Sequence, residues 1–360
     1  MIEIEDLVEM PVKAVDTGAN KIYRSKFEVL SGESDFENVV LSTNRGAWKN
    51  VDWDHEPSKE LSEYFFIRCQ QLRDKYDYLV LYFSGGADSE TMLQSFIKAK
   101  IPVDEIVFTN FNISGSNPCK QLVLAEKTLK IYSQRYLGDK TKINKVTLND
   151  KNFQYFLNNV DWANSSWAGT ISNFTKMPTT IYKKLNFKVD ARESGKVGHI
   201  FGESKPHIIK REGKYFALWD VPLSTSQWAT EWFYTSLDLP ELHVKQCHII
   251  KNWFQKNQPD VELIYEKSGS RKQLNSLIRN PFNDRYQNPK SMGLLRDIKG
   301  NGASEDSLYN KELEKYAPEL YDRYVNEVVK TIIFSANVQF VDPMSGDLKR
   351  LKTESFLLDS

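Results

Sequence analysis

One short stretch constrains the fold of this chain most: an apolar run at 79–83 that leads directly into two glycines and then into a helical pattern. The run is entirely apolar or aromatic, which is typical of a strand covered on both faces of a sheet. After the glycines, Asp88 and Ser89 are residue types that favour a helix start. Apolar residues then recur at helical spacing, at Leu93, Phe96 and Ile97. The stretch therefore predicts a buried strand, a tight turn and a helix.

The predicted turn has the properties of an anion site. Gly85 and Gly86 carry no Cβ, so a ligand can approach their backbone closely. A helix that begins directly after them presents free N–H groups and the positive end of its dipole, and phosphate is the usual anion at such a position. The alternative is a tight strand-to-helix connection that binds nothing.

The residues Ser84, Gly85, Gly86, Asp88 and Ser89 form the pattern Ser-Gly-Gly-x-Asp-Ser, with a strand before it and a helix after it. This pattern resembles the PP-loop of the N-type ATP pyrophosphatases, the adenine nucleotide alpha-hydrolase-like family. That family includes the ATP domains of asparagine synthetase and GMP synthetase, the tRNA-thiolating and tRNA-lysidine enzymes, and the PAPS reductases. The pattern is neither a Walker loop, which requires Gly-Lys-Ser/Thr, nor the dinucleotide pattern Gly-x-Gly-x-x-Gly. The stretches 75–78 and 239–242 give a fainter resemblance to bacteriophage-encoded, PAPS-reductase-like PP-loop proteins.

The resemblance implies a Rossmann-like sheet of the HUP type, and a reaction that cleaves ATP between its α and β phosphates with Mg²⁺. It implies that ATP and pyrophosphate bind at Ser84, Gly85, Gly86, Ala87, Asp88 and Ser89, with Asp88 as a catalytic residue and a Mg²⁺ ligand. It also implies that the adenine lies at the end of the second strand. The candidates to line the adenine are Phe83, Phe108, Thr109 and Asn110, and for those of the second strand simple loop structure is the alternative.

Two further candidates follow the strand expected at 197–202. PP-loop enzymes commonly bring a distant cation onto the leaving pyrophosphate, where it offsets the developing negative charge. Lys205 is the candidate for this catalytic role, and a surface lysine is the alternative. Glu203 is a candidate Mg²⁺ ligand because Mg²⁺ prefers carboxylates, water and phosphate. A solvated carboxylate is the alternative for Glu203.

Strand and helix patterns alternate from 78 to 148, with strands expected at 104–108 and 143–148 after the first one. This alternation predicts an α/β fold with a parallel sheet, right-handed crossovers and helices on both faces. A fourth strand is expected at 197–202 and a hairpin at 207–219. In such sheets ligands bind beyond the carboxyl ends of the strands, which is where the glycine turn lies.

We expect three regions along the chain. Residues 1–57 form an N-terminal extension, residues 58–225 form the PP-loop ATP-binding α/β domain, and residues 226–360 form a mostly helical C-terminal region. The α/β domain is expected to open with a helix that places Leu61, Tyr64, Phe65, Arg68 and Leu72 on one face. The helix after the second strand is expected to bury Leu122, Ala125, Leu129, Tyr132 and Tyr136.

Composition sets broader limits. The chain of 360 residues is 40% hydrophobic and 27% charged, which is ordinary for a soluble globular protein, and no apolar run is long enough to span a membrane. Its acidic start is unlike a signal peptide. Three cysteines lie far apart and form no Cys-x-x-Cys pair, so we expect a reducing cytoplasm, that of the host if the protein is phage-encoded.

Three hypotheses of function remain open at this point. The first is an enzyme that adenylates a carbonyl or carboxylate of a small molecule or nucleobase with ATP, for attack by an amine or ammonia. The second is a PAPS-reductase-like or thiolating sulfur-transfer enzyme, and the third is a non-catalytic nucleotide-binding protein. The cysteines weigh against the second: none follows Cys247, and Cys247-His248 on a helix point apart and are expected to pack rather than react. Residue 2 is Ile2, so the nucleophilic cysteine of glutamine-dependent asparagine synthetases is missing.

The segment 267–300 is the one strongly polarised stretch. It carries eight Lys or Arg residues against Asp284 and Asp297, a local charge of +6 in a chain whose 48 basic and 48 acidic residues balance. Such a segment suits a nucleic-acid backbone, a clamp over the ATP phosphates or a solvated loop. Because the remaining chain carries −6, we favour a small-molecule acceptor.

Overall fold

The computed structural model describes residues 13–16, 21–23, 39–42, 50–112, 120–138, 140–149, 197–202, 206–211, 213–219, 230–236, 238–257, 259, 352–353 and 356–358. Several sequence predictions lie outside these ranges. They concern Glu203, Lys205, the basic segment 267–300, most of the C-terminal region, and residues 150–195, where an aromatic-rich sequence predicts helix.

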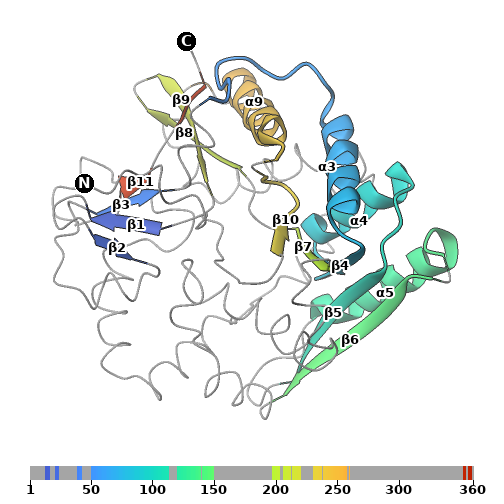
Figure 1. The fold of residues 1–360 in the computed structure, drawn as a ribbon. Helices are drawn as coiled ribbons and strands as arrows, with labels where there is room; N and C mark the ends of the chain where they lie inside the picture. The colour runs from blue at the N-terminus through green and yellow to red at the C-terminus, as the bar shows by residue number, and fades with distance from the viewer. Residues whose placement is uncertain are drawn as a thin grey trace.

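A sheet of five parallel strands forms the centre of the described structure (Figure 1). Its strands are β4 (Tyr78–Tyr82), β5 (Glu105–Asn112), β6 (Lys142–Asn149), β7 (Val197–Phe201) and β10 (Thr230–Trp232). Every neighbouring pair is parallel. The α/β class with a parallel sheet is therefore confirmed, and four of the five strands lie where the sequence predicts them.

The strand order is β10-β7-β4-β5-β6. From β4 the chain proceeds outward through α4 (Ala87–Ala99) to β5 and through α5 (Lys120–Arg135) to β6. It then returns to the other side of β4, where β7 pairs with it along five residues, and β10 adds to β7. The order thus reverses at β4. Since β10 follows residue 225, the sheet extends beyond the point at which we expected the C-terminal region to begin.

One apolar core joins the sheet to its helices. In Figure 1, α3 (Leu61–Lys75), α4 and α5 follow one another along the same side of the sheet. These helices share a core cluster with α9 (Pro240–Asn257) and with one face of the strands, represented by Leu79, Leu81, Ile106 and Ile200. The predicted face of α3 is confirmed, because Leu61, Tyr64, Phe65, Arg68 and Leu72 are all buried. The prediction for α5 fails at Tyr136, which is 56% exposed because it lies just beyond the last residue of the helix.

Two smaller sheets accompany the central one. The first has the order β11-β3-β1-β2 and contains β1 (Lys13–Asp16), β2 (Lys21–Tyr23), β3 (Val39–Ser42) and β11 (Lys352–Thr353). The second is the predicted hairpin of β8 (Pro206–Arg211) and β9 (Lys214–Trp219), extended by β12 (Phe356–Leu357). Gly213 in the hairpin turn has φ +76°, which explains the glycine there. Strands from the C-terminal end therefore complete both sheets.

Among the described helices, none has the combination of length and apolar character that crossing a bilayer requires.

Candidate functional site

The glycine turn lies at the carboxyl end of β4, where the strand order reverses. The Phe83 N–H donates to the Val107 carbonyl at 2.7 Å, so pairing with β5 continues one residue beyond β4, and the turn begins at Ser84. In open α/β sheets, ligands bind outside the carboxyl ends of the strands at the point where the order reverses. The turn therefore occupies the position at which this architecture places its ligands.

The two glycines have different backbone roles. Gly85 has φ +75°, a left-handed conformation that glycine adopts without steric cost. Gly86 is the N-cap of α4, with φ −84° and ψ 165°, and no side chain caps the helix there. The first turn of a helix has N–H groups without partners inside the helix, and a glycine N-cap supplies no side-chain acceptor for them. The N-terminus of α4 is thus built to receive an acceptor from outside.

Two serine hydroxyls hold the turn in shape. The Ser89 hydroxyl accepts the Ser84 N–H at 3.1 Å and donates to the Gly86 carbonyl at 3.0 Å. The Ser84 Oγ accepts the Gly86 N–H at 3.2 Å and lies 3.1 Å from the Ser89 Oγ. Ser89 is buried and Ser84 is exposed. Ser89 therefore fixes the turn from within, whereas Ser84 lies at its exposed surface.

Two carboxylates belong to the first turn of α4, and they face different surroundings. Asp88 is half-buried. Glu90 is 3% exposed and accepts the hydroxyl of Tyr132 at 2.9 Å, while Gln94 donates to the same hydroxyl at 2.6 Å. Glu90 is thus committed to the contact between α4 and α5. Sequence reasoning did not identify this network, because 42 residues separate Glu90 from Tyr132 and no local pattern signals the contact.

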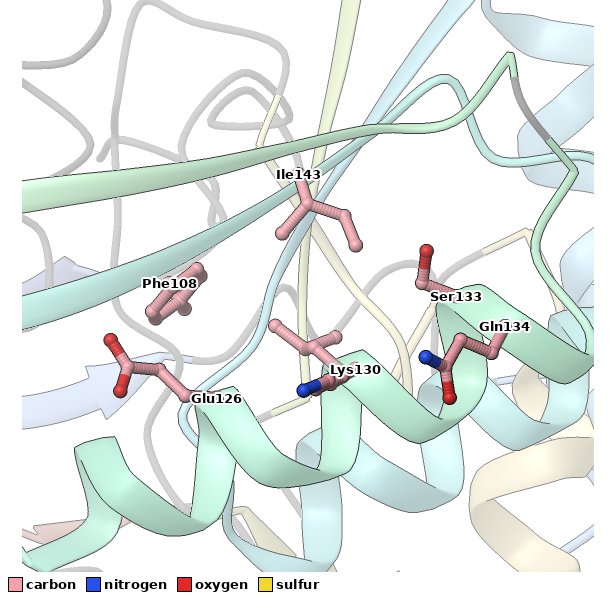
Figure 2. A pocket seen from close by; sticks show the side chains of 7 residues that line it. Phe108, Glu126, Lys130, Ser133, Gln134 and Ile143 are labelled. Atoms are coloured by element: carbon pink, nitrogen blue, oxygen red, sulfur yellow. The ribbon is translucent and has the colours of Figure 1, made fainter.

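Two of the predicted adenine residues, Phe83 and Phe108, have buried side chains in the core cluster. Phe83 is 2% exposed and belongs to the core cluster. Phe108 is 7% exposed and lines a pocket of about 340 Å³ between β5, β6 and α5. Figure 2 shows Phe108 and Ile143 on one side of this pocket and Glu126, Lys130, Ser133 and Gln134 of α5 on the other. Asn110 is half-buried. Thr109 lies in β5, but its side chain is not among those that the structure describes.

Aromatic residues end three neighbouring strands on the face of the sheet opposite the helices. Tyr82, Phe201 and Trp232 are the last residues of β4, β7 and β10, and they are in register. The rings of Tyr82 and Phe201 stack with centroids 4.3 Å apart, and Trp232 lies 5.6 Å from Phe201. The Tyr82 hydroxyl lies 3.0 Å from His199 Nδ1. Tyr82 ends an apolar run, but Trp232 follows Thr230 and Glu231, so the sequence alone does not group these rings. The strand register brings them together.

The cysteines that the structure describes are structural. Cys69 and Cys247 are both fully buried, and burial raises the pKa of each thiol well above its usual range. Nucleophilic cysteines need the thiolate, which this environment disfavours. His248, next to Cys247, donates from Nε2 to the Trp53 carbonyl at 2.8 Å. The prediction that Cys247 and His248 pack rather than react is therefore supported by their surroundings. Trp53 also lies against α9, since its ring packs edge-on against His243 with centroids 6.0 Å apart.

Comparison with known proteins finds no match to a protein-family model and no match among curated proteins. A function for this chain therefore has to be inferred from the geometry and chemistry of the site.

Proposed function

We propose that this protein is an N-type ATP pyrophosphatase with a Rossmann-like sheet of the HUP type. It cleaves ATP between the α and β phosphates and adenylates a carbonyl or carboxylate acceptor, which an amine or ammonia then attacks. The observation that carries the proposal is the glycine turn at Ser84–Ser89, which joins the central strand to an uncapped helix at the reversal of strand order.

The strand order supports the fold assignment. If β4 is taken as the first strand, then the order β6-β5-β4-β7-β10 reads 3-2-1-4-5. This is the order in which Rossmann-like sheets are arranged, with nucleotide phosphates at the turn after the first strand. The helices on one face of the sheet fit this assignment.

Gly86 supports phosphate binding. Its φ and ψ are accessible to any residue, so backbone strain does not require a glycine there. A Cβ at Gly86 would meet only one described atom within 4 Å, the Ser84 Oγ at 3.2 Å. A side chain at this position therefore requires the Ser84 hydroxyl to shift slightly but meets no described backbone. A bound phosphate is a further physical reason for a glycine there.

The proposed chemistry needs positioning more than proton transfer. An acceptor oxygen forms a bond to the α-phosphorus while the bond to the bridging oxygen breaks, and pyrophosphate leaves with that electron pair. The amine nitrogen then forms a bond to the acceptor carbon, and AMP leaves as the nitrogen loses a proton. The N–H groups of the first turn of α4 would accelerate the first step, because they stabilise the negative charge that develops on the phosphate oxygens.

Mg²⁺ fits this site only as a partner of the substrate phosphates. The described residues contain no group of three His, Cys, Asp or Glu side chains that could hold a metal ion. Mg²⁺ in nucleotide sites is usually bound through one or two carboxylates together with phosphates and water. Asp88 is the carboxylate at the turn that would hold it, and Glu203 is a second candidate. When bound, the ion neutralises charge on the phosphates.

The surroundings of the cysteines favour a nitrogen nucleophile over the sulfur-transfer alternative. Cys69 and Cys247 have no access to solvent, and their thiols are held protonated by burial. Cys119 lies outside the described residues and is the remaining candidate for sulfur chemistry.

The test is product analysis. The protein is incubated with ATP, Mg²⁺, ammonia and panels of carboxylates and cyclic amides, and the phosphorus products are followed by ³¹P NMR. We expect AMP and pyrophosphate in equal amounts with the correct acceptor, and neither product from a Gly86→Val variant. Formation of ADP and phosphate would contradict cleavage between the α and β phosphates. ATP binding without cleavage across all acceptors would favour the non-catalytic alternative.

A further inference from the structure

Two residues from distant parts of the chain converge on a single peptide unit of the glycine turn, the one that joins Asp88 to Ser89. The Tyr234 hydroxyl donates to the Asp88 carbonyl at 2.9 Å. Gly202, directly after β7, packs against the same unit: a Cβ there would lie 3.1 Å from the Asp88 carbonyl carbon and oxygen and from the Ser89 nitrogen. Neither contact is needed to close the helix, since α4 forms its own ladder.

The chemistry of that peptide unit connects both contacts to anion binding. The Asp88 carbonyl and the Ser89 N–H share one peptide group, so a hydrogen bond to the oxygen polarises the N–H and strengthens it as a donor. Ser89 is the third residue of α4, and its N–H is among those that a helix cannot satisfy internally. The Tyr234 hydroxyl therefore acts on a donor that faces the anion position.

Tyr234 is itself held rigidly. Its side chain is fully buried, and its ring packs edge-on against Phe65 and Phe233, with centroids 5.7 Å and 5.2 Å away. Its carbonyl accepts a hydrogen bond from Gln246 of α9 at 2.9 Å. A buried and fully supported phenol can fix the position of the atom to which it donates, whereas a mobile one cannot.

We propose that Tyr234 and Gly202 are positioning residues of the anion site: together they hold the Asp88–Ser89 peptide so that the first N–H groups of α4 point at the pyrophosphate portion of ATP. This inference rests on the proposed function. It extends that function to two residues outside the Ser-Gly-Gly-x-Asp-Ser pattern: Gly202, directly after β7, and Tyr234, two residues after β10. The carboxyl ends of three strands, β4, β7 and β10, thus build the site jointly.

The experiment measures the affinity of the full-length protein for ATP with Mg²⁺, and for inorganic pyrophosphate, by calorimetry. Tyr234→Phe removes only the hydroxyl and should weaken both ligands about three- to tenfold, the worth of one hydrogen bond. Gly202→Ala should weaken them at least as much, because the methyl group must displace the peptide. Tyr76→Phe is the matched control, since it deletes a tyrosine hydroxyl that donates to Glu231 at 2.6 Å, away from the turn. Gly138→Ala is the glycine control, because its Cβ would meet no described atom within 4 Å.

If Tyr234 positions the anion site, its substitution should change ligand affinity, whereas the control substitution should change only thermal stability. Tyr76→Phe should lower the melting temperature and leave both affinities unchanged, whereas Tyr234→Phe should lower the affinities. An independent readout without ligand is the amide proton shift of Ser89, which should move upfield in Tyr234→Phe as its peptide group loses polarisation. A wild-type protein that binds ligand while Tyr234→Phe binds it equally, with an unmoved Ser89 amide, would overturn the positioning role and leave the proposed function standing. A wild-type protein that binds neither ATP nor pyrophosphate would overturn both.

Discussion

Two regions of the sheet handle polar groups in opposite ways. The glycine turn consists of backbone groups, two serines and a half-buried aspartate. The second region, which we call the α3 network, joins α3 to the sheet through charged side chains and one tyrosine hydroxyl. Its residues are Arg68, Arg73, Lys75, Tyr76, Asp104, Glu231 and Asp238. The helix that follows the turn has no side-chain cap at its N-terminus, whereas the α3 network assigns an internal partner to each carboxylate.

Glu231 is the centre of the α3 network. Its carboxylate lies 2.8 Å from the fully buried Arg68, 2.8 Å from Lys75, and accepts the Tyr76 hydroxyl at 2.6 Å. Asp104 plays a similar part nearer the start of the strands, where it accepts from Arg73 at 2.6 Å and from the Leu79 N–H at 2.7 Å. Each carboxylate ties a helix residue to the sheet, so this region contributes stability rather than a binding surface.

The two regions therefore differ in what they contribute. The α3 network neutralises its charges in pairs away from the turn, and near the turn the buried carboxylate of Glu90 is bonded to Tyr132. Substitutions in the α3 network should therefore alter stability and spare ligand affinity. Substitutions at the turn should do the reverse.

The largest effect is expected from Glu231→Gln. This change leaves Arg68 buried without the carboxylate that its Nη2 contacts, and the Trp232 carbonyl at 3.1 Å is then the remaining acceptor of that nitrogen. Among the described residues, Arg68 Nε and Nη1 have no acceptor even in the wild type. Breaking a buried ion pair costs about 3–5 kcal/mol, so the free energy of unfolding in urea should fall by roughly that amount. The exposed pair of Lys145 and Glu126 is the control, because Lys145→Gln should cost about 0–1 kcal/mol. Equal losses of unfolding free energy in Glu231→Gln and Lys145→Gln would contradict the stabilising role assigned to the α3 network.

The α3 network also predicts how the free energy of unfolding depends on pH. Burial raises the pKa of Glu231, but the charge of Arg68 and the hydrogen bonds from Lys75 and Tyr76 outweigh it, and the net pKa lies below 4.5. Stability from a carboxylate with a lowered folded-state pKa is fully present above the unfolded pKa and is lost as the pH falls through the folded one. The stability difference between wild type and Glu231→Gln should therefore shrink below about pH 4.5. Urea titrations at several pH values measure it, and a gap that widens in acid would contradict the assignment.

The next effect is expected at the turn. Gly86→Val places a branched side chain where phosphate must approach, and Asp88→Asn removes the carboxylate proposed to hold Mg²⁺. Both variants should keep the wild-type melting temperature without ligand and lose the stabilisation that ATP and Mg²⁺ give, about 2.7 kcal/mol at a hundredfold excess over Kd. Thermal-shift titration measures this, with Gly138→Val as a control that should respond to ATP as wild type does. Undiminished stabilisation in both variants would remove the site from Ser84–Ser89.

Local patterns predict much of the fold. The strands at β4 to β7, the helices α3 to α5 and α9, and the hairpin β8–β9 follow from apolar periodicity, glycines and prolines. The strand β10 could not be predicted in this way, because its three residues, Thr230–Trp232, are too few to show a periodic pattern. Pairing with β7 defines it as a strand of the sheet. β11 and β12 are shorter still, and pairing with β3 and β9 defines them.

The residues of the candidate site also fall into two groups, those that a local sequence pattern predicts and those that only the tertiary structure brings together. The turn could be found from sequence because its chemistry is local: two glycines and two serines within six residues. Tyr234 and Gly202 could not, since they lie 146 and 114 residues from Asp88 and reach it only through the strand order. Phe83 and Phe108 were attractive because they are aromatic and near strand ends, but strand alternation directs both into the core beneath the helices.

The smallest effect is expected from the cysteines, and it separates the nitrogen and sulfur alternatives. In a variant that combines Cys69→Ala, Cys119→Ser and Cys247→Ala, the two buried changes remove only a sulfur atom each from the core and should cost about 1 kcal/mol apiece. Neither belongs to the turn or to the α3 network, so turnover of ATP to AMP and pyrophosphate should stay within about twofold of wild type, a difference below 0.5 kcal/mol in activation free energy. The measurement is steady-state pyrophosphate release below the melting temperature of the variant, with circular dichroism to establish that it is folded. If a folded triple variant lost turnover, a thiol would have to take part in the reaction. Since Cys69 and Cys247 are buried, that thiol would be Cys119, and restoring Cys119 alone would then have to restore the activity.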